Sequence, residues 1–141
     1  MHNKQFLFFV TGDKIYGIDV LKIQAIERVG NITRVPKAPE STIGIMNLRG
    51  NIVPILSFRQ KIGLELCGFE DQMRIIVLDD EEDRVGVLVD KVLDVREVDI
   101  SQVYTDNDVK TDRAENFIQG AVKHQEDMLV TILDSDELIK I

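Results

Sequence analysis

The amino-acid sequence predicts a mainly β protein built as two small barrels by internal duplication. Short runs of β-branched and aromatic residues alternate with turn signals, about five in each half, which is the pattern of a small barrel. The second half also repeats the plan of the first at an offset of about 70 to 77 residues. We therefore expect a single domain over residues 1–141. Its two halves, at about 1–70 and 71–141, can exchange their terminal strands.

The repeat is clearest where Tyr16–Val29 (YGIDVLKIQAIERV) aligns with Val85–Val98 (VGVLVDKVLDVREV). Apolar residues recur at every third position in both copies, which fits either a helical turn or a twisted strand with bulges. A unit of ~70 residues buries little surface alone, so these residues are expected to form an apolar seam shared by the halves. The aligned pairs are Gly17/Gly86, Ile18/Val87, Val20/Val89, Lys22/Lys91, Ile23/Val92, Ile26/Val95 and Val29/Val98.

Each remaining segment of the first half has a local explanation. The prolines at 36 and 39 oppose helix, so the segment around them is extended. Ser57 can cap a short helix that Gly63 can end. The expected elements are strands at Gln5–Thr11 and Ile15–Val20, an extended segment at Thr33–Pro39, a hairpin at Ile43–Leu56 and a helix at Ser57–Gly63.

The second half follows the same order. The acidic run Asp79–Asp83 fails as a calcium loop, because Arg84 stands where glycine is needed and Asp90 where a bidentate Glu is needed. We interpret it as a charged hairpin loop. The expected elements are strands at Arg74–Leu78 and Val85–Val89, a polar connection at Asp106–Arg113, an echo of the central hairpin at Ile118–Gly120 and Ile132–Leu133, and a short helix within 134–141.

Charge is distributed unevenly along the chain. Residues 1–70 hold nine Lys/Arg and six Asp/Glu, whereas residues 71–141 hold eight and nineteen. The acidic half argues against nucleic acid, because phosphate binding needs clustered basic residues. The difference in net charge between the two halves suits oriented docking to a protein, although solvated surface charge explains any single residue equally well. No apolar run spans a bilayer, and the lone Cys67 fits a reducing, intracellular compartment.

Residues that could carry catalysis or bind a cofactor are scarce. His2 and His124 are interpreted as surface residues, and Cys67 as a small buried hydrophobe. No phosphate-binding glycine motif and no metal-ligand spacing occurs. We therefore expect no enzyme activity, no cofactor and no metal.

The central hairpin is the remaining candidate for function. Gly50 tolerates a positive φ and Asn51 suits the same corner, while Pro54 predicts an edge strand or a bulge. Arg49 at the turn either pairs with a carboxylate, the usual role of a lone arginine, or anchors a partner. Its position in a turn rimmed by Ile, Val and Leu favours a docking surface.

The hairpin and its flanks also resemble a known family. The string VPKAPESTIGIMNLRGNIVPILSFRQKIGL (Val35–Leu64) resembles the signature of the CheW family of bacterial chemotaxis adaptors. Tyr16–Val20, Val85–Val92 and the closing Leu133-Asp134 agree, so the resemblance spans residues 5–139. It implies two five-stranded SH3-like barrels in pseudo-twofold tandem and a non-enzymatic function.

That function is to couple chemoreceptors to the histidine kinase CheA by binding both. The resemblance implies contacts with the receptor's cytoplasmic tip and the kinase's regulatory domain, and a cytoplasmic monomer recruited to membrane-associated receptor arrays without inserting in the membrane. By position, Arg49 and Gly44 match residues tied to coupling, and several apolar residues match positions near a groove between the barrels. The expected partner-binding residues are Arg49, Gly44, Asn47, Gly50, Val20, Ile23, Ile26, Glu27 and Val35.

Two further assignments stay open at this point. The chain could be a detached CheW-like module of a CheV-type adaptor, although its length favours the stand-alone form because CheV adds a receiver domain. A small barrel could also bind single-stranded nucleic acid, against which the acidic second half counts.

Overall fold

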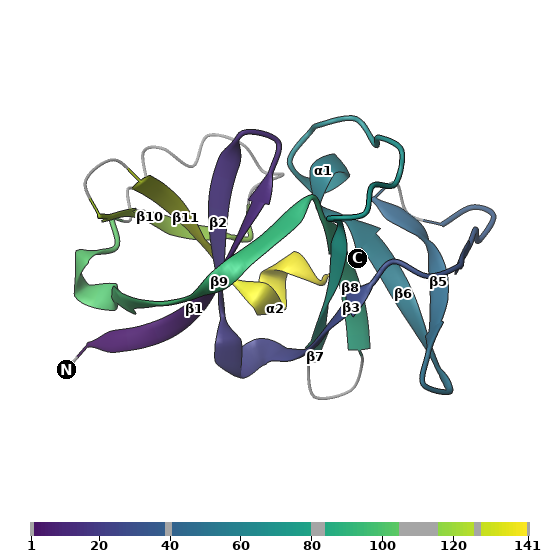
Figure 1. The fold of residues 1–141 in the computed structure, drawn as a ribbon, viewed down its shortest axis with the longest axis horizontal. Helices are drawn as coiled ribbons and strands as arrows, with labels where there is room; N and C mark the ends of the chain where they lie inside the picture. The colour runs from purple at the N-terminus through teal and green to yellow at the C-terminus, as the bar shows by residue number, and fades with distance from the viewer. Residues whose placement is uncertain (1, 39–40, 80–83, 105–115, 126–127, 141) are drawn as a thin grey trace.

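Two β-sheets, each curled into a barrel, lie side by side with the C-terminal helix between them (Figure 1). The computed structural model describes residues 2–38, 41–79, 84–104, 116–125 and 128–140. The first barrel has the strand order β10 (Ile118–His124), β11 (Met128–Leu133), β2 (Lys14–Asp19), β1 (Asn3–Thr11) and β9 (Lys91–Asp99). The second has the order β3 (Ile23–Arg28), β7 (Arg74–Asp79), β8 (Arg84–Val89), β6 (Asn51–Ser57), β5 (Thr42–Leu48) and β4 (Ile32–Thr33).

Each barrel takes strands from both halves of the sequence. The β1–β2 hairpin pairs with β9 and β11, and the β7–β8 hairpin pairs with β3 and β6. The two parallel pairings are related by the repeat, since Gly17 lies opposite Ile132 and Gly86 opposite Ile55. A Cβ on Gly86 would lie 2.7 Å from the Ile55 Cδ1, so this close approach requires a glycine.

The residues at three-residue spacing combine both of the structures that their pattern allowed. The 3₁₀ turn η1 (Val20–Lys22) leads into β3, which has a bulge between Ile23 and Ala25. Beyond the bulge, side chains alternate with the strand period of two, so the three-residue pattern no longer marks one face.

The seam prediction is consequently right for two aligned pairs and wrong for two. Val20/Val89 and Ile23/Val92 belong to or pack against the cluster between the barrels. Ile26/Val95 is exposed. Val29/Val98 lies in or against the separate cores of the two barrels.

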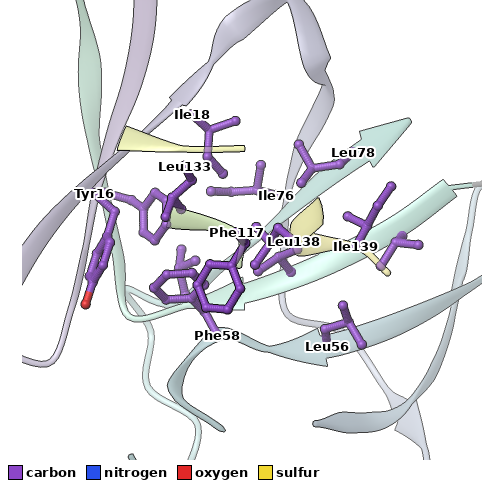
Figure 2. Packing of buried hydrophobic residues seen from close by; sticks show 14 of the residues in the cluster. Tyr16, Ile18, Leu56, Phe58, Ile76, Leu78, Phe117, Leu133, Leu138 and Ile139 are labelled. Carbon is purple, nitrogen blue, oxygen red and sulfur yellow. The ribbon is translucent and has the colours of Figure 1, made fainter. Parts of the chain in front are cut away.

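An aromatic group forms the centre of the shared core (Figure 2). Phe9 and Tyr16 come from the first barrel, and their ring centroids lie 5.1 and 4.7 Å from that of Phe58, which follows β6 of the second barrel. Phe117 lies 6.1 Å from Phe58, and Leu138 of the C-terminal helix is fully buried in the same cluster. The apolar contact between the barrels is therefore a cluster of its own, to which strands of both barrels and the C-terminal helix contribute.

The two predicted short helices are present and occupy equivalent places after β6 and β11. In α1 (Phe58–Lys61) the Ser57 hydroxyl accepts a hydrogen bond from the Gln60 N–H at 3.2 Å, and Gly63 follows with a φ of 86°. In α2 (Ser135–Leu138) the Asp134 carboxylate caps the first turn. None of the helices in the described segments is long and apolar enough to cross a membrane.

The prediction that the Pro54 strand lies at a sheet edge or has a bulge there is wrong, since the bulge of this hairpin falls on β5 between Thr42 and Gly44. β6 lies between β5 and β8, but its pairing with β8 starts only at Ile55. Pro54 precedes that ladder, so its missing N–H removes no bond to β8. The edges of this sheet are β3 and the two-residue β4.

Two single residues also differ from expectation. Cys67 is exposed, because it lies in the irregular segment after α1. His124 is half-buried, with its ring 5.2 Å from that of Phe8, whereas His2 is exposed as expected. Residues 80–83 of the acidic loop and the connection at 106–113 lie outside the described residues, although Asp79 and Arg84 do pair across β7 and β8.

Candidate partner-binding surface

The turn between β5 and β6 has two residues with left-handed backbone. Arg49 has a φ of 52° and Gly50 a φ of 89°, and Leu48 pairs with Asn51 across the turn. Two positive φ values in a two-residue loop are typical of the hairpin turn that matches strand twist. The expectation for Gly50 is confirmed, but Asn51 begins β6 and Arg49 takes the second left-handed position.

Asn47 stabilises this turn directly. Its side-chain Oδ1 accepts a hydrogen bond from the Gly50 N–H at 3.0 Å. The hydrogen bond fixes the backbone on which Arg49 stands, so the arginine projects from an ordered corner.

The Arg49 side chain reaches towards β3 and remains mostly in solvent. Its Nη2 lies 3.5 Å from the Glu27 Oε2, and the two side chains are 83% and 22% exposed. An exposed ion pair of this kind contributes about 0–1 kcal/mol to stability. The structure thus brings together two of the predicted partner-binding residues, in a contact too weak to occupy the guanidinium fully.

The strand period explains why Glu27 meets Arg49 and Ile26 does not. Ala25 and Glu27 share the inner face of β3, and both Ala25 and Val29, just after the strand, pack against the second barrel's core. Ile26 points to the outer face and is 43% exposed. Arg49 and Ile26 therefore belong to two neighbouring surfaces.

The other predicted residues fall into supporting and exposed positions. Val20 and Ile23 are half-buried against the central cluster. Gly44 is buried, and a Cβ there would overlap the Thr33 carbonyl oxygen of β4. Val35, two residues beyond Thr33, is 40% exposed. Gly44 thus supports the segment that presents Val35 and is not itself a contact surface.

Several exposed apolar side chains are not among the nine predicted partner-binding residues. Leu21 in η1 is 85% exposed, Ile52 beside the hairpin turn is 61% exposed, and Val95 on β9 is 50% exposed. The repeat gave a signal for one of them, since Val95 aligns with Ile26. Burial cannot be inferred from apolar character alone, because much of any protein surface is apolar.

The β10–β11 hairpin provides an internal comparison for the Arg49 turn. Gln125 has a φ of 59° at the equivalent corner, and Leu129, equivalent to Ile52, is likewise 61% exposed. The repeat preserves the left-handed first residue and the apolar neighbour but not the arginine, and its loop is one residue longer. Residues 126 and 127 of this loop lie outside the described residues.

A cavity of about 320 Å³ lies in the first barrel, away from these residues. Lys4 and Asp19 line it, with their charged atoms 3.6 Å apart, over an apolar wall that includes Phe6 and Ile132. None of the nine predicted partner-binding residues lines it. Among the described side chains, no group of three metal-ligating residues comes together.

Comparison with known proteins gives consistent matches over the whole chain. The model of the CheW-like domain matches residues 5–141. The chemotaxis proteins CheW of Klebsiella aerogenes and Helicobacter pylori are 32% and 33% identical to the chain, each over 136 residues that cover 96% of it and 81% of the relative. The crystal structure of the scaffolding protein TtCheW from Thermoanaerobacter tengcongensis superposes with a TM-score of 0.86 at 27% identity, covering 98% of this chain and 88% of that one.

Proposed function

The chain belongs to the CheW family of chemotaxis coupling adaptors, and we propose that it joins receptor tips to the regulatory domain of CheA through two surfaces. One surface is the Arg49 turn. The other is the outward apolar side of the crossovers, which are the segments where the chain passes from one barrel to the other, at η1 and β3 and again between β8 and β9. The proposal includes a non-enzymatic role, and a cytoplasmic location from which receptors recruit the chain to their arrays.

The exposed arginine on a fixed, strained corner is the observation that carries the proposal. A non-glycine residue in the left-handed region costs on the order of 1–3 kcal/mol, and such strain concentrates at functional sites. Arg49 adopts this conformation together with Gly50, because the two-residue turn has a positive φ at both central positions. The cost is understandable if the guanidinium must project to solvent, where it can anchor an acidic partner.

The neighbouring apolar residues define what the partner must offer. Ile52, 61% exposed, lies on β6 just beyond the turn, three residues from Arg49. An arginine anchor next to an apolar side chain suits a partner that places a carboxylate beside an apolar contact. Ile26, Leu21 and Val35 provide apolar area for a second contact.

A charge reversal at Arg49 tests this function. We expect Arg49→Glu to weaken co-sedimentation with receptor-containing membranes or with CheA by about tenfold or more, the range of an interface anchor. Urea unfolding should change little, because the pair with Glu27 contributes little to stability. Gln125→Glu is the matched control, since it places the same side chain at the same backbone corner of the other barrel. Unchanged binding of Arg49→Glu to both partners would rule out the Arg49 turn as a docking site.

A further inference from the structure

Asp90 occupies a structural position that the docking surfaces do not explain. It is the single residue between β8 and β9, where the chain passes from the second barrel to the first. Its carboxylate accepts three hydrogen bonds of 3.0 Å each, two from Arg59 Nε and Nη2 and one from the Gly12 N–H. The side chains of Asp90 and Arg59 are only 17% and 25% exposed.

The three donors come from both barrels. Arg59 belongs to α1, which follows β6 of the second barrel, and its hydrogen bond with Asp90 raises the pKa of Arg59. Gly12 forms the β1–β2 turn of the first barrel, with a φ of 65°. Leu64 packs against this turn, since a Cβ on Gly12 would lie 3.0 Å from the Leu64 Cδ1. One carboxylate therefore joins a hairpin of one barrel to a helix of the other.

The other crossover lacks such a junction. At η1, the Lys22 Nζ lies 3.7 Å from the Asp136 Oδ2 of α2, and these side chains are 46% and 60% exposed. Asp136 is the second residue of α2, as Arg59 is the second residue of α1. The helix provides the acid in the Lys22 pair and the base in the Asp90 pair, so the charges of the two pairs are reversed. A single exposed contact is a weak constraint compared with a partly buried bidentate pair.

We propose that Asp90 and Arg59 are positioning residues that fix the angle between the barrels, and through it the apolar surface at the crossovers that receives a partner. The shared apolar core holds the barrels together, but hydrophobic contact is non-directional. Three directed hydrogen bonds to one carboxylate supply the missing orientation. This proposal rests on the proposed function, because the oriented surface matters only if a partner uses it.

Distance measurement between spin labels on the two barrels tests the proposal without any partner. In a Cys67→Ser background, which removes the exposed native thiol, Lys14→Cys labels β2 and Asn51→Cys labels β6. We expect one narrow distance distribution, broadened or split by Asp90→Asn and unchanged by the matched control Asp136→Asn. Circular dichroism establishes that each variant is folded. If Asp90→Asn does not fold, Arg59→Lys replaces it, since it retains the charge but loses the bidentate geometry.

The result separates orientation from mere stability. A folded Asp90→Asn protein with lowered unfolding temperature but an unchanged distance distribution overturns the proposal, and so does equal broadening by Asp136→Asn. Co-sedimentation should fall by roughly 2- to 30-fold for Asp90→Asn, the range for residues that act on binding from a distance. Arg49→Glu should weaken binding with no change in the distance. If Arg49→Glu binds normally, the docking function fails while the distance result still stands.

Discussion

Replacement of Ile26 by alanine distinguishes a proposed docking residue from a core residue on the same pair of strands. Ile26 of β3 pairs with Ile76 of β7 in the register. Ile76 is completely buried in the central cluster, whereas Ile26 is 43% exposed. The two substitutions remove the same atoms from neighbouring backbone positions, so their difference reports burial.

The expected magnitudes follow from that exposure. Full burial of an isoleucine side chain contributes about 1.5–3 kcal/mol, and Ile26 retains a little over half of its burial. Because water fills the space that is left, little cavity cost is added, and Ile26→Ala should lower the free energy of unfolding by about 1 kcal/mol. Ile76→Ala creates a closed cavity and should cost about 2–5 kcal/mol.

Urea unfolding followed by circular dichroism measures both values, and co-sedimentation with receptor membranes measures binding. Ile26→Ala should reduce binding while leaving the folded fraction near that of the parent protein. If Ile26→Ala destabilises the protein as much as Ile76→Ala does, Ile26 is a core residue and the outer face of β3 is not a docking surface.

Three further predictions concern single positions. Gly44→Ala should cost about 1–3 kcal/mol in urea unfolding, because the methyl group overlaps the Thr33 carbonyl; full stability would show that β4 can move away. The Ser101 hydroxyl and backbone N–H donate hydrogen bonds to the Asp99 carboxylate and lower its pKa in the folded protein. Asp99 therefore contributes to the free energy of unfolding at pH values above the pKa of the unfolded chain, and this contribution is lost as the pH falls through the pKa of the folded protein. An NMR titration should show this lowered pKa and its rise in Ser101→Ala; equal values in the two proteins would contradict the assignment. Cys67 should react with a thiol reagent in the native protein at nearly the rate of the unfolded chain, and reaction only in urea would contradict its exposure.

Local features of the fold were predictable because they depend on neighbours in sequence. The cap at Ser57, the stop at Gly63 and the left-handed Gly50 each follow from side-chain chemistry within a few residues. The position of Pro54 was not predictable in the same way. Its strand lies inside the sheet because the β8 ladder begins one residue later, and that register depends on a strand about thirty residues away in sequence.

The candidate site shows the same division. Arg49 and Glu27 were both among the predicted partner-binding residues, but neither motif nor spacing predicted their contact, which depends on how β3 closes against the β5–β6 hairpin. Arg59 and Asp90 were each visible as ordinary charged residues. Their role at the barrel junction appears only once Gly12 is placed beside them by the exchange of strands between halves.

The strand exchange also explains where the two copies could diverge. Gly17 and Gly86 each face an isoleucine of a parallel strand contributed by the opposite half, and a Cβ would lie 3.2 Å from that isoleucine at Gly17 and 2.7 Å from it at Gly86. The hairpin corners and crossovers do not face such a close approach, and the copies differ there. Arg49 stands against Gln125 at the hairpin corners, and a partly buried carboxylate stands against an exposed ion pair at the crossovers. A symmetric framework with asymmetric turns presents two different surfaces. This asymmetry supports the proposed function, in which the chain binds a receptor and a kinase through different surfaces.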